Sequence, residues 1–301
     1  WRHWVVAGDL EQLEKLLDAL WVLDDARGWY HATVELTNDL LGVLAAAPAP
    51  AAGGDTSIPH LHRQGTALQL VVDGRPFLVR GGEIGNSSAT NPATLEPFWP
   101  RLAALNMNTV LAPVYWDLVE PEEGRFDFST LERLVTDARA NRMRLVLLWF
   151  GSWKNSMSGY APAWVKRDPR RFPRATDRDG TPQEILSPFS SVNRDTDARA
   201  FAAVLKHLRQ LDQGTHTVLM VQVENEIGMI PTARDHSAEA DRAFAAVVPA
   251  ELMAHLAAHR EELAPVLRAS WREAGGRATG TWSEVFGPGP AGEEIFMAWH
   301  F

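Results

Sequence analysis

The sequence predicts an α/β fold built on a parallel sheet, and two observations support this. Near-continuous apolar runs, typical of strands buried on both faces, alternate with segments whose apolar residues recur at helical spacing. Four such strand and helix units follow one another before about residue 225 of the 301-residue chain. Four units can form an open sheet or half of an eight-stranded (β/α)8 barrel.

The predicted elements start with a hairpin. Asp73-Gly74 is a strong turn signal, and strand patterns flank it at 66–72 and 75–82. The strands predicted for the parallel sheet cover residues 77–82, 108–114, 144–150 and 216–223. The predicted helices cover residues 92–106, 131–141, 195–211, 237–246 and 249–274, and a last helix opens near Gly292.

The first 52 residues are predicted to lie outside the α/β domain, which we expect at 53–301. Residues 40–52 join a short apolar run to small residues and prolines, as at the end of an export signal. One interpretation is upstream sequence over 1–38 followed by such a signal, which favours a periplasmic or extracellular protein over a cytoplasmic one. The other is an Ala/Pro linker after a small helical segment.

Composition excludes several classes of partner. Acidic residues outnumber basic ones by 38 to 29, a net charge of -9, which argues against a nucleic-acid partner. No apolar stretch reaches the roughly 20 residues needed to span a bilayer, so no membrane partner is expected. The chain has no cysteine, and His255 and His259 lie on a charged, alanine-rich helix pattern. We therefore predict no metal site and no cofactor.

Polar and aromatic residues follow the end of each of the four predicted strands. Ligand sites of parallel α/β folds collect at this carboxyl edge, so the four ends predict one shared site. A tryptophan ring can cover the apolar face of a sugar, although core packing is the alternative for any of the twelve tryptophans. The residues that we expect to bind substrate are Glu83, Tyr115, Trp116, Trp149, Trp153, Asn155 and Asn225.

The fourth strand end, residues 222–226, carries the chemistry. Strand alternation predicts Gln222, Glu224 and Glu226 on one face and the intervening valines on the other. Two carboxyls so near each other repel when both are ionised, and this repulsion raises the proton affinity of one of them. A carboxyl that keeps its proton near neutral pH can protonate a leaving-group oxygen. The alternative is a structural Glu pair bound to a neighbouring Arg or Lys.

These motifs resemble glycoside hydrolase family 35, the β-galactosidases, in what looks like a bacterial subgroup. The resemblance runs from about Gly65 to the end of the chain. The motifs that carry it are Gly81-Gly-Glu-Ile84, Glu120-Pro-x-x-Gly-x-Phe-x-Phe128, Pro162-Ala-Trp164 and Val221-Gln-Val-Glu-Asn-Glu-Ile-Gly228. The resemblance implies a TIM barrel of the retaining clan, with Glu226 as acid/base and Asn225 as a sugar ligand. The loop from Glu120 to Phe128 is expected to be mostly structural.

Two positions depart from the family pattern. Pro113 stands where family members have a galactose-binding tyrosine, and Tyr115 follows two residues later. Asn155 stands where a sugar-binding glutamate is usual, beside Lys154. Galactose therefore follows from the family more than from these residues.

The resemblance implies hydrolysis of O-glycosidic bonds, with terminal β-galactosides or oligosaccharides as substrates. A retaining mechanism needs a second carboxylate as nucleophile, which the family takes from its seventh strand. The chain is expected to hold only the first four units, to lack the nucleophile and to be inactive alone. The alternatives are a retaining glycosidase for another sugar and a non-catalytic carbohydrate-binding or truncated barrel. The sequence leaves the oligomeric state open.

Overall fold

The computed structural model describes residues 58–301 of the chain. The predictions of an export signal or linker over 1–52, and of a domain boundary near residue 53, concern residues outside this range. No helix among residues 58–301 has both the length and the apolar character needed to cross a membrane.

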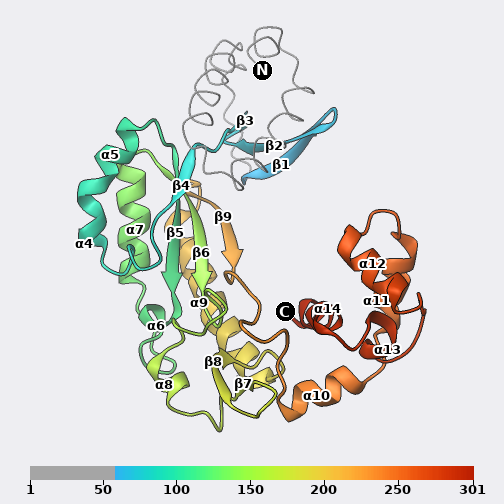
Figure 1. Ribbon diagram of the computed structural model, residues 1–301. Coiled ribbons are helices and arrows are strands. Elements are labelled where there is room, and N and C mark those ends of the chain that lie inside the picture. The colour runs from blue at the N-terminus through green and yellow to red at the C-terminus, as the bar shows by residue number, and fades with distance from the viewer. Residues whose placement is uncertain (1–57) are drawn as a thin grey trace. The chain divides into compact units, whose positions relative to one another are not determined.

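A four-stranded sheet in the order β4-β5-β6-β9 organises the described region (Figure 1). Its strands are Gly81–Glu83 (β4), Thr109–Tyr115 (β5), Arg144–Phe150 (β6) and Val218–Val223 (β9). All neighbouring pairs are parallel, which confirms the predicted parallel sheet. Within residues 58–301 the sheet is open, with β4 and β9 as its outer strands, so the eight-stranded barrel stays a prediction.

Helices connect the strands of this sheet. They are α4 (Pro92–Leu95), the 3-10 helix η1 (Glu96–Phe98), α5 (Trp99–Ala104), α6 (Trp116–Val119), α7 (Ser129–Ala140), α8 (Ala163–Lys166) and α9 (Ser191–Asp212). The single helix predicted over 92–106 is three short pieces. Prolines lie in the first turns of η1 and α5, and a proline nitrogen cannot donate the bond that would continue a helix.

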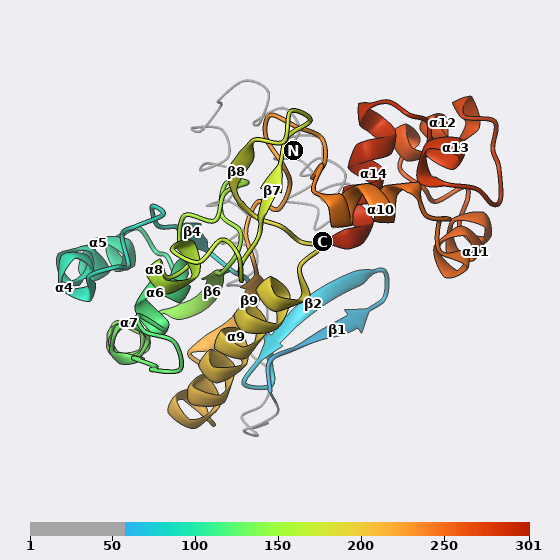
Figure 2. The ribbon, with the colours of Figure 1, turned by 90° about the horizontal axis from the view of Figure 1, so that it is seen from below.

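Five further helices follow the sheet: α10 (Ala238–Ala245), α11 (Ala250–Ala258), α12 (Pro265–Glu273), α13 (Trp282–Phe286) and α14 (Pro290–His300). These helices lie together in the ribbon (Figure 2). They share a buried cluster of their own, in which the rings of Trp282 and Phe296 meet edge to face. The helix predicted over 249–274 is divided because Pro265 opens a new one.

Two antiparallel units complete the fold. The first consists of β1 (His60–Gln64), β2 (Ala67–Val72) and β3 (Arg75–Pro76), and the second pairs β7 (Arg174–Thr176) with β8 (Pro182–Leu186). The predicted hairpin is confirmed: Asp73 and Gly74 have φ of 51° and 73°, and a tight two-residue turn of this kind requires positive φ at both positions.

Ion pairs hold the amino edge of the sheet. The Asp73 carboxylate lies 2.6 Å from the Arg144 guanidinium and 2.7 Å from Nδ1 of His216, which joins the hairpin turn to residues beside β6 and β9. Asp212 accepts hydrogen bonds from the backbone of Thr217 and Val218 at 3.0 and 2.8 Å, and pairs with Arg139. These contacts fix where β9 starts.

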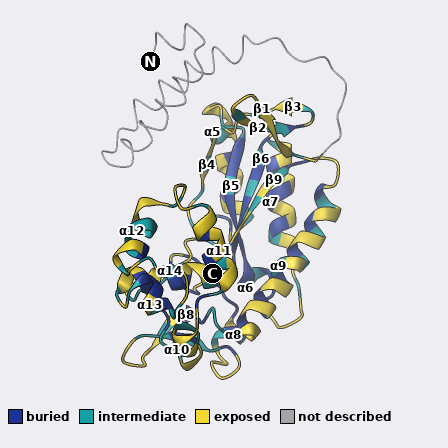
Figure 3. Ribbon diagram, turned by 90° about the vertical axis from the view of Figure 1, so that its right-hand side faces the viewer, coloured by how far each residue is buried: buried dark blue, intermediate teal, exposed yellow. Residues whose placement is uncertain are grey.

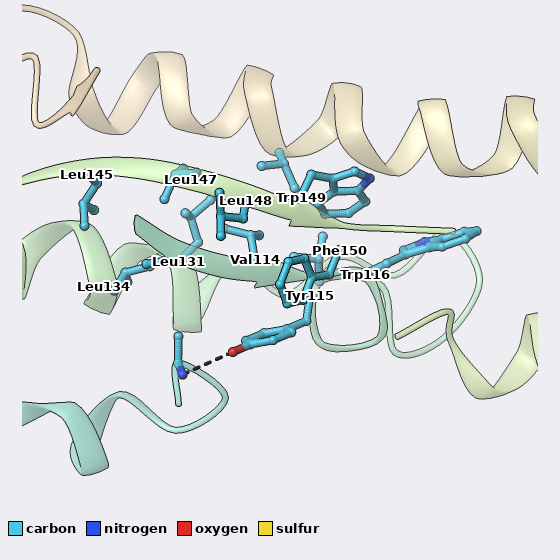
Figure 4. Packing of buried hydrophobic residues seen from close by; sticks show 14 of the residues in the cluster. Val114, Tyr115, Trp116, Leu131, Leu134, Leu145, Leu147, Leu148, Trp149 and Phe150 are labelled. Carbon is cyan, nitrogen blue, oxygen red and sulfur yellow. Dashed lines mark hydrogen bonds between the residues drawn. The ribbon is translucent and has the colours of Figure 1, made fainter. Parts of the chain in front are cut away.

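The largest buried cluster lies along β5 and β6, which are buried over most of their length (Figure 3). Side chains on the two faces of β6 alternate, so the neighbouring rings of Trp149 and Phe150 enter different layers (Figure 4). Phe150 meets Tyr115 edge to face with ring centroids 5.8 Å apart, whereas Trp149 packs on Phe201 of α9. The rigid core thus extends to the carboxyl ends of both strands.

Candidate functional site

The loops after β6 and β9 meet at the carboxyl edge of the sheet. The Lys154 ammonium lies 2.7 Å from a carboxylate oxygen of Glu226 and 2.6 Å from the amide oxygen of Asn225. The backbone N–H of Ser156 donates to the carbonyl of Glu226 at 3.1 Å. Two strand ends that were predicted to share a site are therefore joined by direct contacts.

Lys154 is itself buried, with 6% of its side chain exposed, and its ammonium lies 5.1 Å from the centre of the Phe150 ring. A buried ammonium is stable only when it is paired and hydrogen-bonded, and the Asn225–Glu226 pair supplies both partners. The Glu226 side chain is 58% exposed, so its carboxyl can reach a bound molecule.

A second carboxyl group of the same segment, that of Glu224, turns toward α9. Its two oxygens accept the backbone N–H groups of Ser152 and Trp153 at 3.2 and 2.7 Å. The buried Asp197 of α9 accepts the same Ser152 N–H at 2.6 Å and the Trp149 indole N–H at 2.8 Å. Burial and the charge of Asp197 raise the pKa of Glu224 far above its ordinary value.

The approach of Asp197 to the backbone depends on Gly151. A Cβ at this position would lie 2.4 Å from the Trp149 indole nitrogen and 2.6 Å from each carboxylate oxygen of Asp197. Only glycine leaves this space, so the sequence after β6 is adapted to bring a carboxylate from α9 to the end of the strand.

A cavity of about 260 Å³ adjoins the Glu224 carboxyl group. Trp149, Trp153 and Phe201 give it aromatic walls, and Asp197 and Glu224 add carboxyl groups. Trp153 also contacts Phe301, with ring centroids 4.8 Å apart. The two tryptophans predicted to cover a sugar thus line one cavity together, but both rings are at most 5% exposed.

The predicted alternation of side chains over residues 222–226 is wrong, because β9 ends at Val223. Glu224 and Glu226 have φ of 61° and 49°, outside the strand conformation, so their carboxyls reach different partners. Val223 is 62% exposed instead of packing against helices. The raised pKa of Glu224 is due to burial and to the charge of Asp197, a residue outside the motif.

Of the other four predicted binding residues, two are buried and two are exposed. Tyr115 and Trp116 are fully buried: the Tyr115 hydroxyl accepts the Ala89 N–H at 3.2 Å, and the Trp116 indole donates to Glu120 at 3.0 Å. Their rings therefore pack within the protein in this structure. Glu83 and Asn155 are exposed and, among residues 58–301, make no side-chain hydrogen bond.

The loop from Glu120 is structural, as predicted. The fully buried Glu120 carboxylate accepts hydrogen bonds from Trp116, Gly124 and Arg199, and so joins α6 to α9. The contacts of Asp197 with the loop after β6 were not predicted, because Asp197 lies within an ordinary amphipathic helix pattern. Lys154 was not predicted as a site residue, although it precedes the predicted Asn155. Its position in a loop that follows a strand of the sheet could have indicated its role. No cluster of three potential metal ligands occurs among the residues that the structure describes.

Comparison with known proteins gives a consistent family. The family model Glyco_hydro_42, described as β-galactosidase, matches residues 99–299. A β-galactosidase from Xanthomonas manihotis is 30% identical over 209 residues, which are 67% of this chain and 31% of that protein. Human β-galactosidase-1-like protein 3 is 30% identical over 167 residues, which are 53% of this chain and 23% of that protein. The chain thus spans less than a third of either relative.

Two solved structures show weaker likeness. One is a catalytic mutant of a GH42 β-galactosidase from G. stearothermophilus, with a TM-score of 0.45 and 21% identity over 70% of this chain and 27% of that one. The other is a β-galactosidase from Halorubrum lacusprofundi, with a TM-score of 0.43 and 21% identity over 70% of this chain and 29% of that one.

The matching model is that of family 42, so the number 35 suggested by the motifs is not confirmed, whereas membership of a glycoside hydrolase family described as β-galactosidase is confirmed. The family model covers two thirds of the chain, including both strand-end loops of the cluster. The chain belongs to glycoside hydrolase family 42, the family described as β-galactosidase.

Proposed function

We propose that the protein containing this chain hydrolyses terminal β-galactosides by a retaining mechanism in which Glu226 is the acid/base. One observation carries the proposal: Asn225 and Glu226 lie within three residues of the carboxyl end of a parallel strand, in a chain that belongs to a β-galactosidase family. The proposal includes a (β/α)8 barrel of which β4, β5, β6 and β9 are the first four strands.

The exposure of the Glu226 side chain suits this role. Its carboxyl is exposed, so it can protonate the departing oxygen in the first step and activate water in the second. Asn225 places a neutral amide beside it for a sugar hydroxyl. Lys154 binds both side chains and fixes their separation from the loop after β6.

The second carboxylate of a retaining enzyme lies about 5–5.5 Å from the acid/base and attacks the anomeric carbon. We do not assign this role to Glu224 or Asp197. The oxygens of both carboxyls accept N–H groups of the loop after β6, and burial and the charge of Asp197 raise the pKa of Glu224, whereas a nucleophile needs a free, ionised oxygen. Labelling with a 2-deoxy-2-fluoro galactoside, followed by peptide mass spectrometry, identifies the nucleophile.

The acid/base role is tested with Glu226→Gln and Glu226→Ala on aryl β-galactosides of graded leaving-group acidity. We expect turnover to fall by about 10²–10⁴-fold for poor leaving groups and far less for activated ones, which need no proton. Azide should restore turnover of Glu226→Ala on activated substrates and give a galactosyl azide of retained configuration.

Glu122→Gln, an exposed carboxyl of the loop after α6, is the matched control and should behave as wild type. Near-normal turnover of poor leaving groups by Glu226→Gln would exclude Glu226 as acid. A panel of aryl glycosides in the same assay tests the preference for galactose.

A further inference from the structure

We infer that Glu224 and Asp197 share one proton and together clamp the loop after β6, so that Glu224 is a positioning residue for Glu226. The inference rests on the proposed function of Glu226 for its catalytic part, whereas the clamp itself does not. Glu224 lies two residues before Glu226 but contacts different groups, and the proposed chemistry does not use it.

The two carboxyls of the clamp bind the same short stretch of backbone, the N–H groups of Ser152 and Trp153. Ser152 N–H points at both carboxyls, with Asp197 at 2.6 Å and Glu224 at 3.2 Å, and the Trp153 N–H adds a second bond to Glu224 at 2.7 Å. The next residue is Lys154, whose ammonium binds Glu226 at 2.7 Å. The held backbone is therefore continuous with the side chain that contacts the acid/base.

The shared proton follows from the charges around the pair. A buried and a half-buried carboxyl that bind the same backbone N–H repel each other when both are ionised, and burial and the charge of Asp197 raise the pKa of Glu224. The nearby Lys154 is bound to Asn225 and Glu226, and Arg194 of α9 pairs with Asp195. His300 lines the same cavity, and burial lowers its pKa.

A protonated Glu224 has a clear consequence for stability. Its raised pKa means that the folded protein keeps a proton that the unfolded chain releases above the ordinary pKa of glutamate. Stability therefore falls as pH rises from that value toward the folded pKa. Glu224→Gln imitates the protonated carboxyl, since its amide can donate to Asp197 and its oxygen can accept a backbone N–H.

The first experiment compares melting temperatures of the 301-residue wild type and Glu224→Gln from pH 5.5 to 8. As pH rises, we expect the melting temperature of Glu224→Gln to gain about 3 °C on that of wild type for each pH unit. This is the effect of one linked proton in a domain of this size. Asp197→Asn should show a similarly shallower pH dependence than wild type, and the control Glu122→Gln should follow wild type. A pH-independent difference for both variants would show that the pair shares no proton.

The second experiment measures hydrogen exchange in peptides covering 151–157 and 224–228. Glu224→Ala should speed exchange in both peptides at least tenfold, because the backbone N–H groups lose their acceptor, and Glu224→Gln should restore most of the protection. Unchanged exchange in Glu224→Ala would overturn the clamp. Neither readout requires turnover, so both stand even if the proposed function fails.

The third experiment uses the proposed activity. Glu224→Ala should lower kcat about tenfold more for poor than for activated leaving groups with little change in KM, and Glu224→Gln should remain within about threefold of wild type. A merely structural role would lower kcat equally for both substrate types. Equal losses would therefore overturn the role of Glu224 in positioning Glu226. The acid/base role of Glu226 itself would still be decided by the Glu226 variants.

Discussion

The two edges of the parallel sheet are both rich in carboxylates but use them in opposite ways. At the amino edge each carboxylate meets cations or N–H donors: Asp73 contacts Arg144 and His216, and hydrogen bonds from His216 and Arg144 hold the pKa of Asp73 below its ordinary value. At the carboxyl edge Glu224 meets another carboxyl, and its pKa is raised. The amino edge is arranged for stability in the ionised state, whereas the contact between Glu224 and Asp197 at the carboxyl edge raises proton affinity.

The contrast indicates where function is to be sought in this fold. At the amino edge, the ion pairs and hydrogen bonds of the carboxylates hold the strand starts in place, and folding alone explains them. A pair of like charges held together by backbone N–H groups costs stability near neutral pH, so it calls for another explanation. The clamp on the loop after β6 provides one.

The largest expected effect tests the amino edge. Burial opposes ionisation of Asp212, but hydrogen bonds from Thr215, Val218, Thr217 and Arg139 outweigh it and lower its pKa. Asp212→Ala leaves these donors without their acceptor and should lower the free energy of unfolding by about 3 kcal/mol at pH 7. The stability that Asp212 contributes is present above the unfolded pKa of aspartate and lost as pH falls through the folded pKa.

Urea unfolding of Asp212→Ala and wild type at pH 7 and pH 3 measures this effect. The loss should shrink at the lower pH, opposite in sign to the pH dependence expected for Glu224. If the stability contributions of Asp212 and Glu224 changed with pH in the same direction, the proposed contrast between the two edges of the sheet would be wrong.

A smaller effect is expected at Gly151. The added Cβ of Gly151→Ala would collide with Trp149 and Asp197. Such overpacking should lower the free energy of unfolding by about 2 kcal/mol. The displaced Asp197 should also reduce the pH dependence of stability linked to Glu224. Gly159→Ala is the control: its Cβ would meet nothing within 4 Å, and its stability should match wild type in the same urea titration.

The smallest effect concerns Tyr115. Tyr115→Phe removes the hydroxyl that accepts the Ala89 N–H but keeps the ring in the core, and should cost about 1 kcal/mol. Galactoside turnover should stay close to wild type, because the ring is buried. A large rise in KM would instead support the predicted contact between Tyr115 and substrate.

The sequence predicted the strands better than the site. Apolar runs located β6 to the residue and placed β5 and β9 within two residues, because burial on both faces leaves an unmistakable composition. Prolines marked helix starts that the periodicity did not reveal, as at Pro265. The motif Gln222–Glu226 was found, but its geometry was not, because positive φ at Glu224 and Glu226 cancels the alternation on which the prediction depended.

The partners of these residues could not be predicted for a different reason. Asp197 reaches Glu224 from within a helix pattern with no local signal, and only the packing of α9 against β6 brings them together. Trp116 and Tyr115 were expected at a binding surface because they follow a strand, yet Glu120 and Ala89 bind their polar atoms inside the protein. Burial of a strand-end side chain depends on the loops that cover it.

The Asp73 turn has a consequence for the order of folding. Its hairpin needs only local residues and can form within about 1–10 μs. The partners of its carboxylate, Arg144 and His216, lie 71 and 143 residues further along the chain. During synthesis at roughly 5–20 residues per second, the hairpin waits roughly 7 to 30 s for His216. The turn can therefore form long before its carboxylate meets both partners, and its docking reports that the residue leading into β9 has taken its place.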